Sequence, residues 1–423
     1  MLRAFVNAFK IPDLRNKILF TVFIIAVYRL GSHLPIPNVD FDVLAAEVER
    51  QSRGGVLEFI NLFSGGALTR LALFALGIMP YITSSIIMQL LTVVIPKLEQ
   101  WQKQGEIGVK KITQWTRYMT VTLALLQSTG LIFLFNNQFQ GSIREFTPPR
   151  VAFMVLTLTA GTALIMWLGE LITQRGIGNG MSILIFTSII SRLPFEGANV
   201  LRVGGNLKFS VIVGLGLLII VAVVFMEQGQ RRIPVQYAKR VVGRRMTSGG
   251  STYIPLKVNQ AGVIPIIFAS SVLYFPTLIA SAVGGGFKSF VDRYLANQGS
   301  IAYILIYGLL VVFFAYFYTA ISFNPVDTAD NIRKYGGFIP GIRPGKPTAE
   351  YLQRILSRIT LPGSLFLATI ALVPSIVFAV WLLDPNTFPF GGTSILIVVG
   401  VALETMKQLE SQLTMRHYEG FLR

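Results

Sequence analysis

The chain has 423 residues, of which 52% are hydrophobic and only 13% are charged. A soluble domain carries about 25% charged residues, so the composition excludes intrinsic disorder, collagen and coiled coil and predicts an all-α integral membrane protein. The 37 Lys and Arg exceed the 20 Asp and Glu, which gives a net charge of +17 and predicts a polyanionic partner such as lipid headgroups, nucleic acid or an acidic protein. The absence of cysteine excludes disulfides, thiolate metal sites and thiol nucleophiles.

Ten apolar segments along the chain are each about long enough to cross a bilayer as a helix, although the fifth is short. They cover residues 18–34, 71–95, 116–135, 150–172, 180–194, 209–226, 260–284, 301–323, 359–382 and 392–408. Most Lys and Arg fall on the side of the N-terminus, so the positive-inside rule predicts that both termini are cytoplasmic. Arg29 is the one clear charge inside a span, and we expect it to snorkel to an interface.

Two long loops on the predicted cytoplasmic side, about 227–258 and 324–358, are rich in Lys and Arg. Their Gly and Pro residues indicate built hairpins rather than slack linkers. The basic residues that we single out are Arg231, Arg232, Lys239, Arg240, Arg244, Arg245, Lys257 and Arg343. Two interpretations stay open: the charges set topology and contact anionic lipid, or the loops dock a macromolecule.

Two short strings recur at an offset of five spans. Gly77-Ile-Met-Pro-Tyr-Ile82 resembles Gly262-Val-Ile-Pro-Ile-Ile267, and Gly180-Met-Ser-Ile-Leu-Ile185 resembles Gly392-Thr-Ser-Ile-Leu-Ile397. An odd number of spans per repeat inserts the second copy upside down, which is typical of many transporters, whose working site lies at the bilayer midplane between the halves. We therefore predict two inverted halves, residues 1–194 and 195–423.

The repeat places isoleucines at corresponding positions, and no Asp or Glu lies in the middle of a predicted span. Buried isoleucines are commonly core or lipid-facing, but at a pseudo-symmetric midplane they can form an apolar constriction that blocks ions by dewetting. The segment 54–66 is too short and Gly-rich to span. It is either an interfacial turn or a re-entrant stopper under such a constriction.

No nucleotide-binding, metal-binding or catalytic motif is present, so we expect no enzymatic activity and no cofactor. The two histidines, His33 and His417, lie near opposite ends of the chain and outside any motif. The Gly176–Gly180 stretch has no P-loop lysine and is interpreted as a tight turn.

Several strings together resemble the SecY family, whose members are channel subunits of protein translocases. These strings are Asn61-Leu-Phe-Ser-Gly-Gly-Ala67, Phe74-Ala-Leu-Gly-Ile-Met-Pro-Tyr-Ile82, Arg175-Gly-Ile-Gly-Asn-Gly180, Gln236-Tyr-Ala-Lys-Arg240, Ala261-Gly-Val-Ile-Pro265, Thr328-Ala-Asp-Asn331 and Gly341-Ile-Arg-Pro-Gly345. The resemblance covers nearly the whole chain. It implies a channel for unfolded secretory polypeptides in the bacterial cell membrane, with lateral release of transmembrane segments into lipid.

The resemblance also implies roles for particular residues. The pore ring falls on Ile78, Ile82, Ile185, Ile267 and Ile397. The plug falls at about 57–70, with Asn61, Leu62, Phe63, Ser64, Gly65 and Gly66 at its centre. The lateral gate, between the second and third and the seventh and eighth spans, includes Thr83, Gln127 and Ser271. For Gln127, ordinary hydrogen bonding between helices is an equally good interpretation.

The partners implied are SecE, SecG, the SecA motor ATPase, the translating ribosome, signal sequences and nascent chains, anionic lipids, SecDF and YidC. Two alternatives stay open. A small-solute transporter with inverted repeats predicts a polar midplane pocket and saturable flux. A membrane scaffold that only anchors ribosomes predicts no polypeptide conduction.

Overall fold

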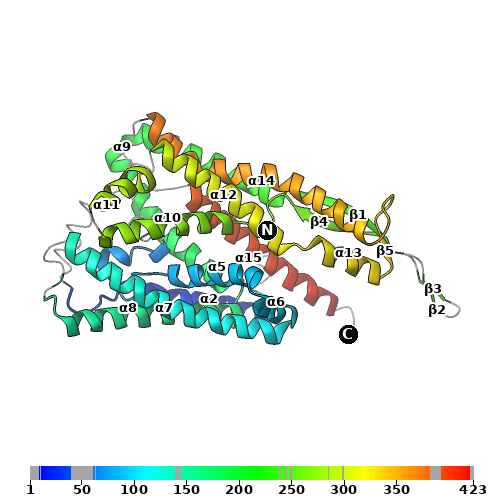
Figure 1. Ribbon diagram of the computed structural model, residues 1–423, viewed down its shortest axis with the longest axis horizontal. Coiled ribbons are helices and arrows are strands. Elements are labelled where there is room, and N and C mark those ends of the chain that lie inside the picture. The colour runs from blue at the N-terminus through cyan, green and yellow to red at the C-terminus, as the bar shows by residue number, and fades with distance from the viewer. Residues whose placement is uncertain are drawn as a thin grey trace.

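The computed structural model describes residues 9, 11–39, 61, 63–138, 143, 145–237, 240–242, 245–247, 251–283, 285–297, 300–381 and 392–419. Its helices run mostly along the long axis of the molecule, and a small sheet lies at one end (Figure 1). The helices that precede the sheet are α2 (Pro12–Gly31), η1 (Leu68–Arg70), α5 (Met79–Val94), α6 (Pro96–Lys103), α7 (Glu106–Gln138), α8 (Pro148–Arg175) and α9 (Gly180–Gln228). The helices that follow its first strands are α10 (Ile264–Val283), α11 (Gly285–Val291), η2 (Asp292–Ala296), α12 (Ile301–Ser322), α13 (Pro325–Lys334), α14 (Lys346–Trp381) and α15 (Gly392–Glu419).

Every predicted span coincides with helix for most of its length, but the count of ten stays a prediction. By length and composition, six helices of the described chain could cross a membrane, or seven if α5 and α6, bent by 100°, count as one span. α2 carries charged residues at both ends, α15 carries them toward its C-terminal end, and α10 holds a shorter apolar stretch. Large apolar side chains stand exposed along the helices, for example Leu218 and Phe225 on α9, as expected of surfaces that face lipid.

The second predicted span begins later than its apolar composition indicated. Residues 71–78 form turns, and α5 starts only at Met79. Leu71 and Gly77 adopt positive φ values of 40° and 57°, which a helix cannot accommodate. The predicted fifth and sixth spans lie on one continuous ribbon, α9, which breaks only at Gly205 (φ 70°, ψ 176°).

The hairpin predicted for the basic loop at about 227–258 is present. Strand β1 (Gln230–Tyr237) pairs antiparallel with β4 (Ser251–Lys257), and β2 (Arg240–Val242) pairs with β3 (Arg245–Thr247) at its tip. The other basic loop is mostly helical, because α13 and the first turns of α14 occupy it, but its short strand β5 (Gly337–Phe338) also joins β1. The resulting order β4-β1-β5 unites the two loops in one sheet.

The repeated strings have matching local structure. Gly77 and Gly262 have φ values of 57° and 59°, and each lies two residues before a helix, α5 or α10. Gly180 and Gly392 are the first residues of α9 and α15. Equivalent backbone at both pairs supports the internal repeat, and the division into two inverted halves remains a prediction.

Candidate functional site

Five isoleucines from four helices meet in one hydrophobic cluster. Ile78, Ile185, Ile267 and Ile397 are buried in it, and Ile82 packs against it partly exposed. Ile78 and Ile82 lie at the start of α5, whereas the other three come from α9, α10 and α15. Residues up to 319 positions apart in sequence, Ile78 and Ile397, are therefore brought together by the folding of the whole bundle, and all of the five except Ile78 are positions that the repeat singled out.

The plug was predicted at about 57–70, of which 57–60 and Leu62 fall outside the described residues; the rest, Asn61 and residues 63–70, is called the plug segment here and lies against this cluster. Phe63 is 1% exposed and belongs to the same cluster as the isoleucines. The backbone of Phe63 and Ser64 approaches Gly77 so closely that a Cβ there would lie 3.0 Å from the Phe63 carbonyl oxygen. A glycine before α5 is thus required both by the left-handed backbone and by this contact.

Local hydrogen bonds hold the plug segment in its turn. The Ser64 hydroxyl donates to the Asn61 carbonyl at 3.3 Å and accepts from the Leu68 N–H at 3.2 Å. Gly65 and Gly66 have φ values of 64° and 89°. These left-handed residues reverse the chain between the helical residues 63–64 and η1.

The predicted gate residues lie on helices that pack together. α10 packs against both α5 and α7. The Thr83 hydroxyl donates to the Met79 carbonyl and the Ser271 hydroxyl to the Ile267 carbonyl, at 2.9 and 2.8 Å, so both are satisfied within their own helices. Gln127 is buried, and its Nε2 has no hydrogen-bond partner in the described chain. The Gln127 amide nitrogen is thus a buried polar group whose loss of hydration no hydrogen bond of the described chain replaces.

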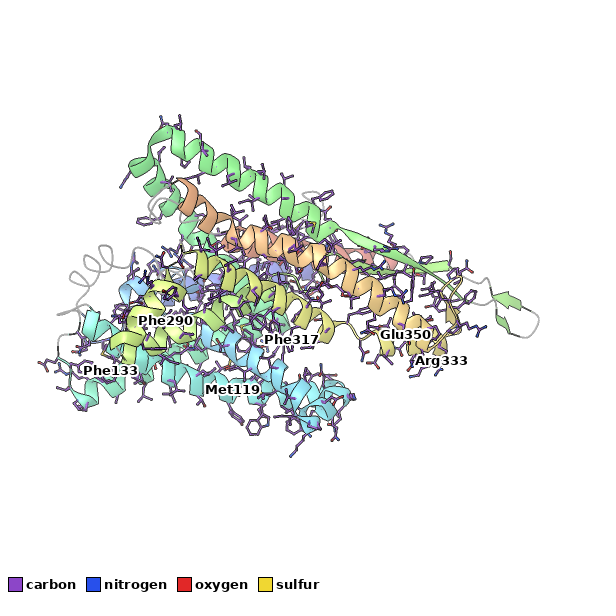
Figure 2. All side chains as sticks on the ribbon, turned by 45° about the horizontal axis from the view of Figure 1, so that its top comes forward. Met119, Phe133, Phe290, Phe317, Arg333 and Glu350 are labelled. Atoms are coloured by element: carbon purple, nitrogen blue, oxygen red, sulfur yellow. The ribbon has the colours of Figure 1, made fainter. Side chains whose placement is uncertain are left out.

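The basic loops form a platform with its own small core. Ile233, Val235 and Leu256 of the sheet pack on Ile332, Ile339, Leu352 and Ile355 from α13, α14 and the segment between them. Figure 2 shows Arg333 of α13 and Glu350 of α14 at this end of the molecule, far from Phe133 and Phe290. The platform is therefore a built surface and not a flexible loop.

Cations stand on the outer face of the platform. Arg231, Arg232, Lys257 and Arg343 are exposed, and the Arg232 guanidinium lies 4.9 Å from the Tyr253 ring centroid. Arg240 and Arg245 lie in the β2–β3 hairpin, while Lys239 and Arg244 fall outside the described residues. The Thr348 hydroxyl donates to the Arg343 carbonyl at 2.8 Å and so fixes the backbone from which Arg343 projects.

Two side chains that the sequence did not assign to the site reach it from α2. Tyr28 is buried, with its hydroxyl 2.6 Å from the Ser188 Oγ of α9. Arg29 donates to the Gly65 carbonyl and to Ser191, so the expectation of snorkelling was wrong. The sequence signal that could have predicted this contact is an isolated charge in one span, Arg29, together with two serines spaced three residues apart in another span, Ser188 and Ser191.

A profile of the SecY family matches residues 72–406. The protein translocase subunit SecY of Streptomyces galbus is 57% identical over 440 residues, covering 100% of both chains. One similar solved structure (TM-score 0.64, 17% identity, 96% of each chain) is a SecY protein whose plug domain is described as stabilising its closed state and maintaining a membrane seal. Another is Sec61 in a canine ribosome–channel complex from the endoplasmic reticulum (TM-score 0.60, 16% identity, 96% of each chain). The chain therefore belongs to the SecY family of protein translocase channel subunits.

Proposed function

We propose that the chain forms a pore for unfolded secretory polypeptides, closed at rest by the isoleucine ring and the plug segment. The observation that carries this proposal is the single cluster in which Ile78, Ile82, Ile185, Ile267 and Ile397 meet Phe63. An apolar constriction excludes ions because water and hydrated ions lose their hydrogen bonds inside it. It also offers no polar group for a particular substrate to match, so chains of any sequence can pass.

Lateral release uses the contact of α10 with α5 and α7. The halves separate along this contact, and a signal sequence or nascent transmembrane helix enters between them. The predicted gate residues Thr83, Gln127 and Ser271 lie one on each of these three helices. Apolar segments then leave sideways into lipid, while polar segments cross through the ring.

The basic platform docks the partner that supplies the chain. Its exposed arginines and Lys257 suit a polyanion such as ribosomal RNA, and the canine relative is a ribosome–channel complex. We propose that the same surface also binds the SecA motor ATPase, and that SecE, SecG and anionic lipid contact the outside of the helix bundle. The proposed setting is the bacterial cell membrane with both termini cytoplasmic, and no reaction or cofactor is assigned to the chain.

Ion conductance of the resting channel tests the ring directly. The double variant Ile82→Gly with Ile267→Gly should leak ions in planar bilayers, because water fills the widened constriction. The matched control is Ile132→Gly with Ile219→Gly, which removes two buried isoleucines that belong to other clusters. If the ring variant stays as tight as the control, the isoleucines do not seal the channel and the proposal fails.

A further inference from the structure

Arg29 places a cation at the end of α2, among groups of the plug segment and α9. One guanidinium nitrogen, Nη1, donates to the Gly65 carbonyl at 3.1 Å and to the Ser191 hydroxyl at 2.9 Å. Ser191 in turn donates to the Ser188 carbonyl at 2.8 Å. No ion pair of Arg29 is found within the described ranges, so a main-chain carbonyl and a hydroxyl solvate this charge.

The turn at Gly65 is seated between the two helices. Gly65 is buried, and a Cβ built there would lie 3.2 Å from Arg29 Nη1, 3.2 Å from Ser188 Cα and 3.4 Å from Ser188 Cβ. Its φ of 64° turns its carbonyl away from an ordinary helical path. The arginine thus contacts the plug segment through its backbone, at a residue that lies close to α9.

We propose that Arg29 is a positioning residue whose guanidinium holds the end turn of the plug segment in its resting place, a role that rests on the function proposed above. A hydrogen bond from a charged donor is about twice as strong as a neutral one. When the plug segment leaves, the partly exposed Arg29 loses the Gly65 carbonyl and keeps Ser191 of these two acceptors. Displacement of the plug therefore costs a charge-assisted hydrogen bond, and the resting state is favoured.

Removal of the guanidinium should raise the population of the displaced plug. A charge-assisted hydrogen bond of ordinary strength corresponds to a shift of roughly tenfold or more in the equilibrium between seated and displaced states. Arg29→Met keeps the length and apolar stem of the side chain, and should raise resting conductance by about that factor. Arg29→Lys keeps the charge and one donor group, so its resting conductance should lie between those of the parent protein and Arg29→Met.

Arg70 provides a matched control. It is an exposed arginine in η1, at the other end of the same plug segment. Arg70→Met removes the same charge from nearly the same part of the chain, and should leave conductance as in the parent protein. Equal leaks from Arg70→Met and Arg29→Met would show that net charge matters and the Gly65 contact does not.

A reversible crosslink separates plug displacement from general loosening. Because the chain contains no cysteine, Gly65→Cys with Ser188→Cys introduces one pair, and the Cβ separation of 3.4 Å is close to that of natural disulfides. In this background Arg29→Met should leak when reduced, and the leak should vanish on oxidation, since the disulfide replaces the arginine. A leak that persists after complete oxidation would overturn the proposal.

The ring variants distinguish this inference from the proposed function. If Ile82→Gly with Ile267→Gly conducts ions while Arg29→Met stays tight, the sealing ring stands and the role of Arg29 is refuted. If Arg29→Met leaks and the ring variant does not, the plug segment alone seals the channel and the ring proposal is wrong.

Discussion

Gly180 begins α9 in direct contact with α8, and no side chain fits there. A Cβ on Gly180 would lie 1.8 Å from the Gly169 carbonyl oxygen and 2.8 Å from the Ile172 Cβ. The Gly180 N–H also donates to the Thr173 hydroxyl at 2.9 Å, which fixes the start of the helix. Gly180→Ala must therefore push α9 away from α8 or break this hydrogen bond.

The size of the effect follows from this overlap. Nonbonded atoms ordinarily stay about 3.5 Å apart, so the backbone has to retreat by more than 1 Å, and overpacking on this scale costs about 1–3 kcal/mol or more. The higher helix propensity of alanine relative to glycine stabilises the folded chain by at most about 1 kcal/mol. We expect a net loss near 2 kcal/mol in the free energy of unfolding. Ile185 follows five residues later on the same helix, so the ring should loosen as well.

Thermal unfolding in detergent and resting conductance measure the two consequences. Gly214→Ala is the control, because Gly214 is an exposed glycine in the same α9 ribbon and a Cβ there meets nothing within 4 Å. Gly180→Ala should melt several degrees lower and leak ions, whereas Gly214→Ala should melt at the parent temperature or slightly higher. Equal melting temperatures for the two variants would refute the close approach of α8 and α9.

Two further predictions concern charged side chains. Arg117 Nε and Nη2 donate to the two Glu170 carboxylate oxygens at 2.7 Å each and so join α7 to α8. A double-mutant cycle with Arg117→Met and Glu170→Gln, measured by thermal unfolding, should therefore give a coupling energy of about 1 kcal/mol. If the stability losses of the two single variants simply add up in the double variant, the pairing is contradicted. Arg343→Glu should weaken ribosome binding several-fold at low salt and less at high salt, because an exposed cation acts through screened attraction. Arg293→Glu, at the other end of the molecule, is its control, and an equal loss in both would contradict specific docking by the platform.

Most residues of the proposed ring could be predicted from the sequence because the two copies of the repeat share a backbone conformation as well as side chains at matching positions. Gly77 and Gly262 are needed for the same left-handed residue before a helix, and that requirement kept both strings recognisable. The isoleucines five residues further on then occupy equivalent positions on α5 and α10. The hairpin of the basic loop at 227–258 was also predicted from its Gly and Pro residues, although its two prolines, Pro234 and Pro255, lie within the paired strands β1 and β4.

Other features depend on contacts that no local pattern records. Residues 71–78 are as apolar as a membrane helix, yet they form turns because the plug segment packs against Gly77. The Gly and Pro residues of the basic loop at 324–358 indicated a hairpin, but the loop is mostly helical, and its helices are stabilised by the small core that they share with the β-sheet. Arg29 looked like a snorkelling residue because its acceptors, Gly65 and Ser191, lie 36 and 162 positions away.

The proposed mechanism combines two interactions that would respond differently to an entering chain. The apolar ring is held by burial, so in this proposal a polypeptide that fills it replaces the lost contacts whatever its sequence. The Arg29 contact with Gly65 is polar and directional, and a passing apolar segment cannot replace it. If both proposals hold, opening is opposed mainly by the plug segment, and the ring widens once that segment has moved. In the same proposal, a signal sequence that separates α10 from α5 and α7 would also loosen the packing beneath the plug segment.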